Sequence, residues 1–279
     1  MPDRPRRSFE AWPLSLSYYT VPELDAVEAV QVAADCGCAH IGLRLLGGQP
    51  GGSEMPLMTQ PELRRELKTA MRERQISALD ANTARLIPES DVAAFAPFLD
   101  VAAELGAKHV LTTLDDPDDN RALDNFTALC EAAAGRSLTI DVEFVPWLSV
   151  HDLVSAAALL RRCGHPAAGI ALDALHFYRS GGSLEDLVTL PLEWFRYLQL
   201  CDAPRLEAAP SRDALIHEAV KERLLPGEGA IDLAGLLRAF PAPLPLALEV
   251  PQTELSARLD ARGRVLRAAR ATQAVLEGI

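Results

Sequence analysis

Four polar side chains in the second half of the chain each lie near the end of a short apolar segment that is typical of a buried strand. Glu143 lies in TIDVEF, Asp173 in IALDAL, Gln199 in YLQLCD and Glu249 in LALEV. A buried carboxylate destabilises a protein unless a cation or hydrogen bonds balance its charge. The chemistry of this region therefore depends on what the three carboxylates contact.

Side-chain alternation along the strands predicts that the four residues share one pocket. In residues 138–144 the apolar side chains occupy every second position, which leaves Glu143 on the opposite face. The same alternation places Asp173 and Glu249 on the inner faces of their strands, each after a small residue. Gln199 occupies the same face of its strand as Tyr197 and Cys201, so it can lie beside the three carboxylates.

Three carboxylates in a closed pocket need a cation, because neighbouring negative charges raise one another's pKa. Three carboxylates and an amide oxygen suit Mg²⁺ or Mn²⁺ better than zinc. We therefore predict one divalent ion, Mn²⁺ or Mg²⁺, held by Glu143, Asp173, Gln199 and Glu249. The alternative is that each carboxylate is paired separately with an inward-facing arginine or lysine.

The elements that position these residues alternate regularly along the chain. Apolar runs rich in Val, Ile and Leu are separated by amphipathic stretches that carry helix-capping residues at their starts and glycines at their ends. The predicted strands span residues 14–20, 40–46, 76–81, 109–114, 138–144, 168–174, 196–201 and 244–250. The longest segment expected to be irregular spans residues 203–230. Eight strand and helix pairs in 279 residues predict an α/β fold, a single (β/α)8 TIM barrel, whose chemistry lies at the carboxyl ends of the strands.

Composition excludes several classes of partner. The net charge of −12 argues against nucleic acid, because phosphate binding depends on lysine and arginine. No apolar run approaches membrane-spanning length, and the five cysteines include no paired CxxC spacing, which favours reduced thiols in a cytoplasmic protein. We predict one domain over residues 1–279 with a flexible arm over residues 1–12. Neither a nucleic acid nor a membrane partner is expected, and homo-oligomerisation is left open.

Five segments resemble the xylose isomerase-like TIM barrel superfamily, the sugar phosphate isomerase/epimerase group. The resemblance covers nearly the whole chain and implies the four metal ligands predicted above, with Glu143 and Glu249 as the catalytic pair that moves protons. The segments are DVEFVP (141–146), LDALHFYRSGG (172–182), LQLCDAP (198–204), RLLPGEG (223–229) and LALEVP (246–251).

The same resemblance implies three substrate-binding residues, namely His176, Arg179 and Arg205. The alternatives are a structural histidine and two solvated loop arginines. Two positions depart from relatives within the superfamily. Gln199 stands where many epimerases have histidine, and Val145 stands where dehydroshikimate dehydratases have another histidine. Three further residues near strand ends, Tyr18, Arg44 and Trp147, are candidates for the pocket wall.

The predicted reaction begins with removal of a proton next to a carbonyl group, which gives an enediolate. Return of the proton epimerises or isomerises the substrate, whereas loss of a neighbouring hydroxyl dehydrates it. Our first hypothesis is a metal-dependent isomerase or epimerase of a sugar or related polyhydroxy ketone. The alternative is a metal-dependent dehydratase, a lyase of the 3-dehydroshikimate or keto-inositol dehydratase kind. A barrel that binds a ligand without turnover is disfavoured by the set of inward acids.

Overall fold

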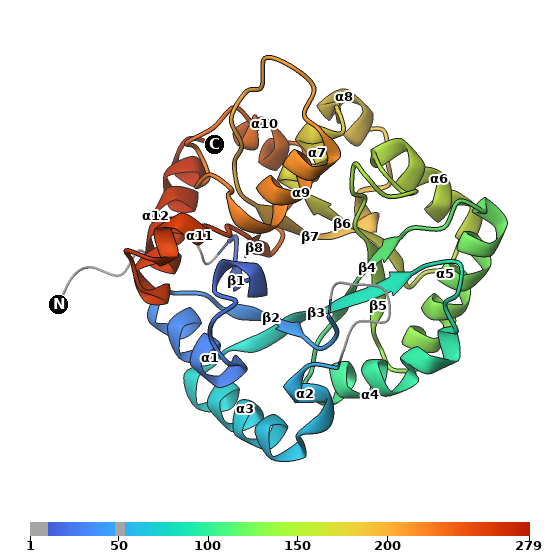
Figure 1. Cartoon of the computed structure of the whole chain (residues 1–279), viewed down its shortest axis with the longest axis horizontal. Helices are drawn as coiled ribbons and strands as arrows, with labels where there is room; N and C mark the ends of the chain where they lie inside the picture. Colours follow the sequence, from blue (N-terminus) through green and yellow to red (C-terminus); the bar gives the residue numbers. More distant parts are fainter. Residues whose placement is uncertain (1–10, 48–53) are drawn as a thin grey trace.

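Eight parallel strands form a closed barrel in the computed structural model of the chain (Figure 1). The structure describes residues 11–47 and 54–279. Each strand pairs with the next one in the sequence, and β8 pairs with β1 to close the barrel. The predicted (β/α)8 barrel is therefore confirmed. The strands are β1 (Leu14–Leu16), β2 (His40–Arg44), β3 (Ser77–Leu86), β4 (His109–Leu114), β5 (Thr139–Val142), β6 (Ala168–Asp173), β7 (Phe195–Leu200) and β8 (Leu246–Leu248).

Helices surround the barrel on its outer side (Figure 1). Most of them begin at an aspartate or serine whose side chain accepts backbone N–H groups of the first turn, as Asp25 does for α1 and Asp152 for α6. None of the helices in the two described ranges is long and apolar enough to cross a membrane. The α-helices are α1 (Ala26–Asp35), α2 (Pro56–Thr59), α3 (Pro61–Arg74), α4 (Ala96–Glu104), α5 (Asp119–Ala134), α6 (Leu153–Cys163), α7 (Ala174–Arg179), α8 (Leu184–Leu187), α9 (Arg212–Lys221), α10 (Leu233–Arg238), α11 (Thr253–Ser256) and α12 (Ala261–Glu277), and the 3-10 helices are η1 (Tyr18–Thr20), η2 (Val92–Phe95) and η3 (Leu192–Trp194).

Two sequence expectations differ from the structure in ways that affect the site. Residues 14–20 were expected to be one strand, but β1 ends at Leu16 and the chain turns into η1. Residues 203–230 carry no strand or helix in the sequence-based expectation, but they contain α9, which Ser211 caps. Of the predicted flexible arm, residues 1–10 lie outside the described residues, whereas Trp12 packs against the core.

The main core lies between the outer faces of the strands and the helices. A second and smaller set of buried apolar side chains lies inside the barrel. On β6, β7 and β8 each member of this set stands two residues before a predicted site residue, so the set forms the floor of the pocket. We call it the interior apolar cluster, and it comprises Leu79, Leu111, Ala171, Tyr197 and Ala247.

A layer of buried and half-buried charged residues lies on the other side of the interior apolar cluster, toward the amino ends of the strands. Asp141 lies between His109, whose Nδ1 is 3.1 Å from its Oδ2, and Arg196, whose Nε is 3.4 Å from its Oδ1. The Tyr197 hydroxyl donates a hydrogen bond to Asp80 at 3.3 Å. Gly169 makes room for this layer, since a Cβ at that position would overlap Asp141.

Asp80 gives the protein a predictable dependence of stability on pH. Burial raises the pKa of Asp80 from 3.8 to about 6, against the smaller lowering effect of His109. A carboxyl group whose pKa is higher in the folded state stabilises the fold fully below about pH 4, and this contribution is lost as the pH rises through about 6. A shift of this size corresponds to roughly 3 kcal/mol.

The gain in the free energy of unfolding that Asp80→Asn gives over the unmodified protein is therefore expected to be larger at pH 7.5 than at pH 4. The difference between the two gains should be roughly 1–3 kcal/mol. Urea denaturation at the two pH values measures this difference. Asp124→Asn, a substitution at an exposed position on α5, is the control and should show no such pH dependence. An equal effect of Asp80→Asn at both pH values would contradict the prediction.

Candidate active site at the carboxyl ends of the strands

The four predicted ligands lie together at the carboxyl ends of β5 to β8. Glu143 directly follows β5, Asp173 is the last residue of β6, Gln199 lies on β7 and Glu249 directly follows β8. All four are buried, with at most 9% of any of these residues exposed. The strand register pairs Asp173 with Gln199, and Gln199 with the residue two before Glu249. The barrel therefore brings together residues up to 106 positions apart in the sequence.

These buried residues form two groups. Glu143, Asp173 and His176 each offer a ligand atom, and these atoms lie within 4.8 Å of one another. Glu249 lies outside that group and accepts a hydrogen bond from the Gln199 amide nitrogen. Two of the predicted ligands thus lie beside His176, which the sequence had suggested only as a substrate contact.

Asp173 is balanced by protein groups. Its Oδ1 caps α7 by accepting hydrogen bonds from the backbone N–H groups of Leu175 at 2.7 Å and His176 at 3.2 Å. Its Oδ2 accepts a hydrogen bond from Nη1 of Arg223 at 2.7 Å. Burial acts to raise its pKa, but Arg223 and His176 hold the pKa below its ordinary value. The sequence left open that each carboxylate is paired with an inward-facing arginine or lysine, and for Asp173 the structure shows such an arginine. A carboxylate offers about four acceptor positions, and these three bonds leave one for a further ligand.

Arg223 is the residue of this site that sequence reasoning missed. Its side chain is 3% exposed, and its Nε donates to the carbonyl oxygen of Ala219 at the end of α9. Alternation could not identify it, because it lies in the segment expected to be irregular. The bridge between Asp202 and Leu224 holds this segment against the end of β7 and so directs Arg223 into the pocket. The only sequence signal was its place at the start of RLLPGEG.

His176 is a buried histidine with one unsatisfied ring nitrogen among the described residues. No hydrogen-bond partner for its Nδ1 exists in the described part of the chain, and the ring packs edge-on against Trp147 at 5.4 Å between centroids. Burial lowers the pKa of His176 to about 4, against the opposite effect of Asp173, so the imidazole is neutral at pH 7. A neutral imidazole is the form that binds a metal or accepts a hydrogen bond from a substrate.

The two predicted substrate-binding arginines have different surroundings. Arg179 makes a two-pronged ion pair with Glu218, at 2.7 and 2.6 Å, and donates to the carbonyl oxygen of Pro204, so it connects α7 to α9. Arg205 is exposed in the loop after β7. Their substrate-binding roles stay predictions, and the Glu218 pair gives Arg179 a structural function in addition.

The electrostatics of the two glutamates fit a cation. Burial raises the pKa of Glu143 well above its usual value, and Glu249 and Asp173 raise it further. Burial also raises the pKa of Glu249 to about 7, although Arg223 lowers it. The Gln199 carbonyl oxygen is buried without a hydrogen-bond partner in the described residues, as is His176 Nδ1. A divalent ion would satisfy these atoms, but a set that includes His176 no longer favours Mg²⁺ or Mn²⁺ over zinc.

Comparison with known proteins identifies the family of the chain. Residues 30–270 match the sequence model of a family described as xylose isomerase-like TIM barrel. The chain belongs to the xylose isomerase-like TIM barrel family. The resemblance of the sequence segments to that family is thus confirmed, and members of the family are enzymes.

Two curated proteins with similar sequences are 3-dehydroshikimate dehydratases. The one from Pseudomonas putida is 30% identical over 160 residues, which cover 54% of this chain and 24% of the relative. The one from Pseudomonas aeruginosa is 34% identical over 131 residues, which cover 46% of this chain and 20% of the relative. The aligned region therefore spans about a quarter or less of the length of these relatives.

Solved structures with the same fold are more distant in sequence. An IolI protein with bound zinc superposes with a TM-score of 0.81 at 20% identity, over 95% of this chain and 98% of that one. A D-allulose 3-epimerase from Methylomonas sp. gives a TM-score of 0.67 at 15% identity, over 95% and 97% of the two chains. At these identities the likeness concerns the fold alone.

Proposed function

We propose that the chain is a divalent-metal-dependent enzyme that removes a proton next to the carbonyl group of a polyhydroxylated substrate and then expels a neighbouring hydroxyl group as water. The observation that carries the proposal is the pair of buried glutamates with raised pKa values beside the Glu143, Asp173 and His176 group. These three residues, with Gln199 and Glu249, would hold the ion. When bound, the ion would polarise the substrate carbonyl as a Lewis acid.

Glu249 is suited to take the proton from carbon. Its pKa of about 7 lies near the operating pH, which is where a general base works best. The Gln199 amide holds one of its carboxylate oxygens, so the other is oriented for the transfer. The C–H electron pair becomes the new carbon–carbon double bond, and the neighbouring C–O bond breaks.

Glu143 is suited to protonate the departing hydroxyl. Burial and the charges of Glu249 and Asp173 raise its pKa, so Glu143 can carry a proton more readily than an exposed glutamate. The hydroxyl leaves as water with the proton of Glu143, while Glu249 holds the proton taken from carbon. Exchange of these protons with solvent restores the starting state.

Dehydration is preferred over epimerisation because of the sequence relatives. Both curated relatives named above are dehydratases at 30% identity or more, whereas the epimerase likeness concerns the fold alone. Isomerisation or epimerisation is the second candidate. Val145 favours it, because the extra histidine that the resemblance implies for dehydroshikimate dehydratases is missing.

Mass spectrometry in D₂O separates the two reactions. The protein is loaded with Mn²⁺, Mg²⁺ or Zn²⁺ in turn and incubated with 3-dehydroshikimate or with a ketose such as D-allulose. We expect a product lighter by one water from the keto acid, and loss of the reaction after chelation with EDTA. Deuterium next to the carbonyl without loss of water would support the epimerase alternative. No reaction and no exchange with either substrate would contradict both.

A further inference from the structure

Arg44 is a charged residue at the carboxyl ends of the barrel strands that the proposed reaction does not use. It is the last residue of β2, which is four strands from β6 in the eight-stranded barrel and therefore on the opposite side of the pocket from Asp173. Its guanidinium group lies over the rings of Tyr18 and Tyr19 of η1, at 5.5 and 5.2 Å from their centroids. Stacking on aromatic faces fixes the plane of the guanidinium group.

Arg44 has no acidic partner in the described part of the chain. Its Nη1 donates to Thr83 Oγ1 at 3.1 Å, and no ion pair accompanies this bond. Other arginines with buried side chains are paired, as Arg223 is with Asp173 and Arg179 with Glu218. A partly buried guanidinium group that is ordered by stacking but lacks a carboxylate is available to a ligand.

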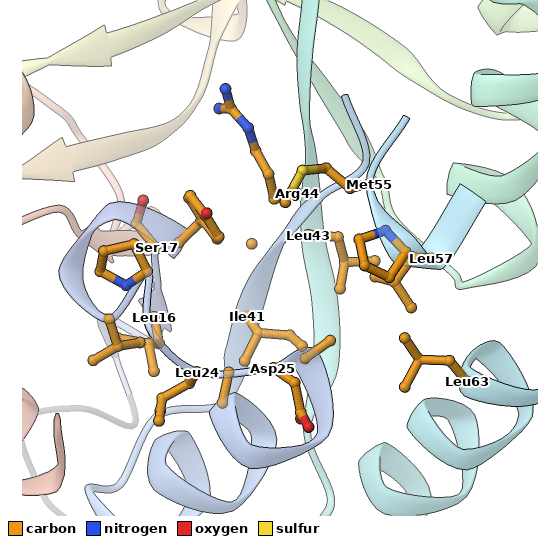
Figure 2. Close-up of a pocket in the computed structure, with 17 residues that line it drawn as sticks. Leu16, Ser17, Leu24, Asp25, Ile41, Leu43, Arg44, Met55, Leu57 and Leu63 are labelled. Carbon is orange, nitrogen blue, oxygen red and sulfur yellow. The ribbon is translucent and has the colours of Figure 1, made fainter. Parts of the chain in front are cut away.

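The surroundings of Arg44 are otherwise apolar on one side and acidic on the other. It lies at the polar end of a separate cavity of about 140 Å³, whose walls are mainly apolar and include none of the four predicted ligands. In Figure 2 its side chain extends away from apolar residues such as Leu24 and Leu63. Arg44 has the same strand parity as Gly42, and a Cβ on Gly42 would overlap Asp80 inside the barrel, so the Arg44 side chain leaves β2 on the inner face. Arg44 therefore lies on the inner face of the barrel, at the same end as the two glutamates.

We propose that Arg44, together with Tyr18 and Tyr19, binds a carboxylate group of the substrate at the end far from the reacting carbons. The substrate is then a polyhydroxylated keto acid and not a neutral sugar. The inference rests on the proposed function in assuming that the substrate occupies the same pocket.

The free edge of the guanidinium group matches a carboxylate. Nε and Nη2 of Arg44 make no hydrogen bond in the described ranges, so both are free to donate to the two oxygens of one carboxylate. A phosphate dianion fits less well. It would meet one guanidinium group and, across the pocket, the glutamates that already disfavour negative charge.

Calorimetric binding to the metal-loaded protein tests the inference without turnover. The probes are quinate, a cyclic polyhydroxy acid without a ketone, its methyl ester, and fructose 6-phosphate. We expect quinate to bind at least tenfold more tightly than its ester. Arg44→Met should weaken quinate binding at least tenfold and ester binding less than threefold, and Arg44→Lys should give an intermediate loss because a lysine keeps the charge but not the planar fork. If the methionine variant does not fold, the lysine variant provides the comparison.

Arg161→Met is the matched control, because Arg161 also stacks on an aromatic ring, that of Trp194, but on the outer α6. Equal affinity for quinate and its ester, equal losses for both in Arg44→Met, or tighter Arg44-dependent binding of the phosphate would overturn the inference. Arg44-dependent quinate binding without any turnover would leave the carboxylate site standing and remove the proposed reaction. If Arg44→Met turned over a keto acid as well as the unmodified protein does, the proposed reaction would stand and the carboxylate site at Arg44 would be removed.

Discussion

Glu249→Gln is expected to lower kcat by about 10²-fold or more, the usual effect of removing a positioned acid or base. Glutamine has the shape of glutamate and still accepts the hydrogen bond from Gln199, but it cannot take up the substrate proton. Because the group of Glu143, Asp173 and His176 is untouched, the variant should retain part of its metal affinity. Steady-state kinetics together with elemental analysis measure both quantities.

Glu254→Gln is the matched control, since Glu254 is an exposed residue on α11 only five positions further along the chain. Its kcat should stay within about twofold of the unmodified enzyme, as expected for a surface substitution. A Glu249→Gln variant that kept a third or more of the original kcat would show that Glu249 is not the base. Complete loss of metal would instead show that Glu249 is mainly a ligand.

Arg223→Met is expected to lower the free energy of unfolding by about 3–5 kcal/mol, the usual cost of removing one partner from a buried ion pair. The substitution leaves the Asp173 carboxylate buried with two backbone N–H groups and no guanidinium group. A divalent ion beside Asp173 would then be its main counter-charge. Addition of Mn²⁺ should therefore raise the melting temperature of the variant more than that of the unmodified protein.

Arg65→Met provides the comparison for this result. Arg65 pairs with Glu62 on α3, and both side chains are 71% exposed, so the substitution should change stability by less than about 0.5 kcal/mol. Thermal and urea denaturation with and without the metal cover all the samples. A loss below about 1 kcal/mol in Arg223→Met would mean that Asp173 does not depend on Arg223, for example because it takes up a proton.

The part of the site that lies on strands could be predicted from the sequence, because alternation links each strand residue to one face of the barrel. β4 spans the predicted residues 109–114, and Glu143, Asp173, Gln199 and Glu249 are all buried at the carboxyl ends of neighbouring strands. Their roles as ligands stay predictions.

The partners supplied by loops could not be predicted in the same way. Arg223 reaches Asp173 because the chain after α9 returns to the end of β7, and no local period in the sequence encodes that return. Tyr18 and Tyr19 lie over Arg44 because the chain leaves the strand direction after Leu16, where the sequence still alternates like a strand. Contacts of this kind depend on tertiary packing.

Two arginines connect the helix α9 to the barrel, one through an ion pair and one through a hydrogen bond. Arg179 reaches it from α7 through Glu218, and Arg223 follows it and joins the carbonyl oxygen of Ala219 to Asp173. A chimera that received this loop from another barrel without an arginine at position 223 would lose a counter-charge inside its own catalytic pocket. Exchange of loops between such enzymes, whether by design or by recombination, must therefore transfer α9, Arg223 and the end of β6 as one module.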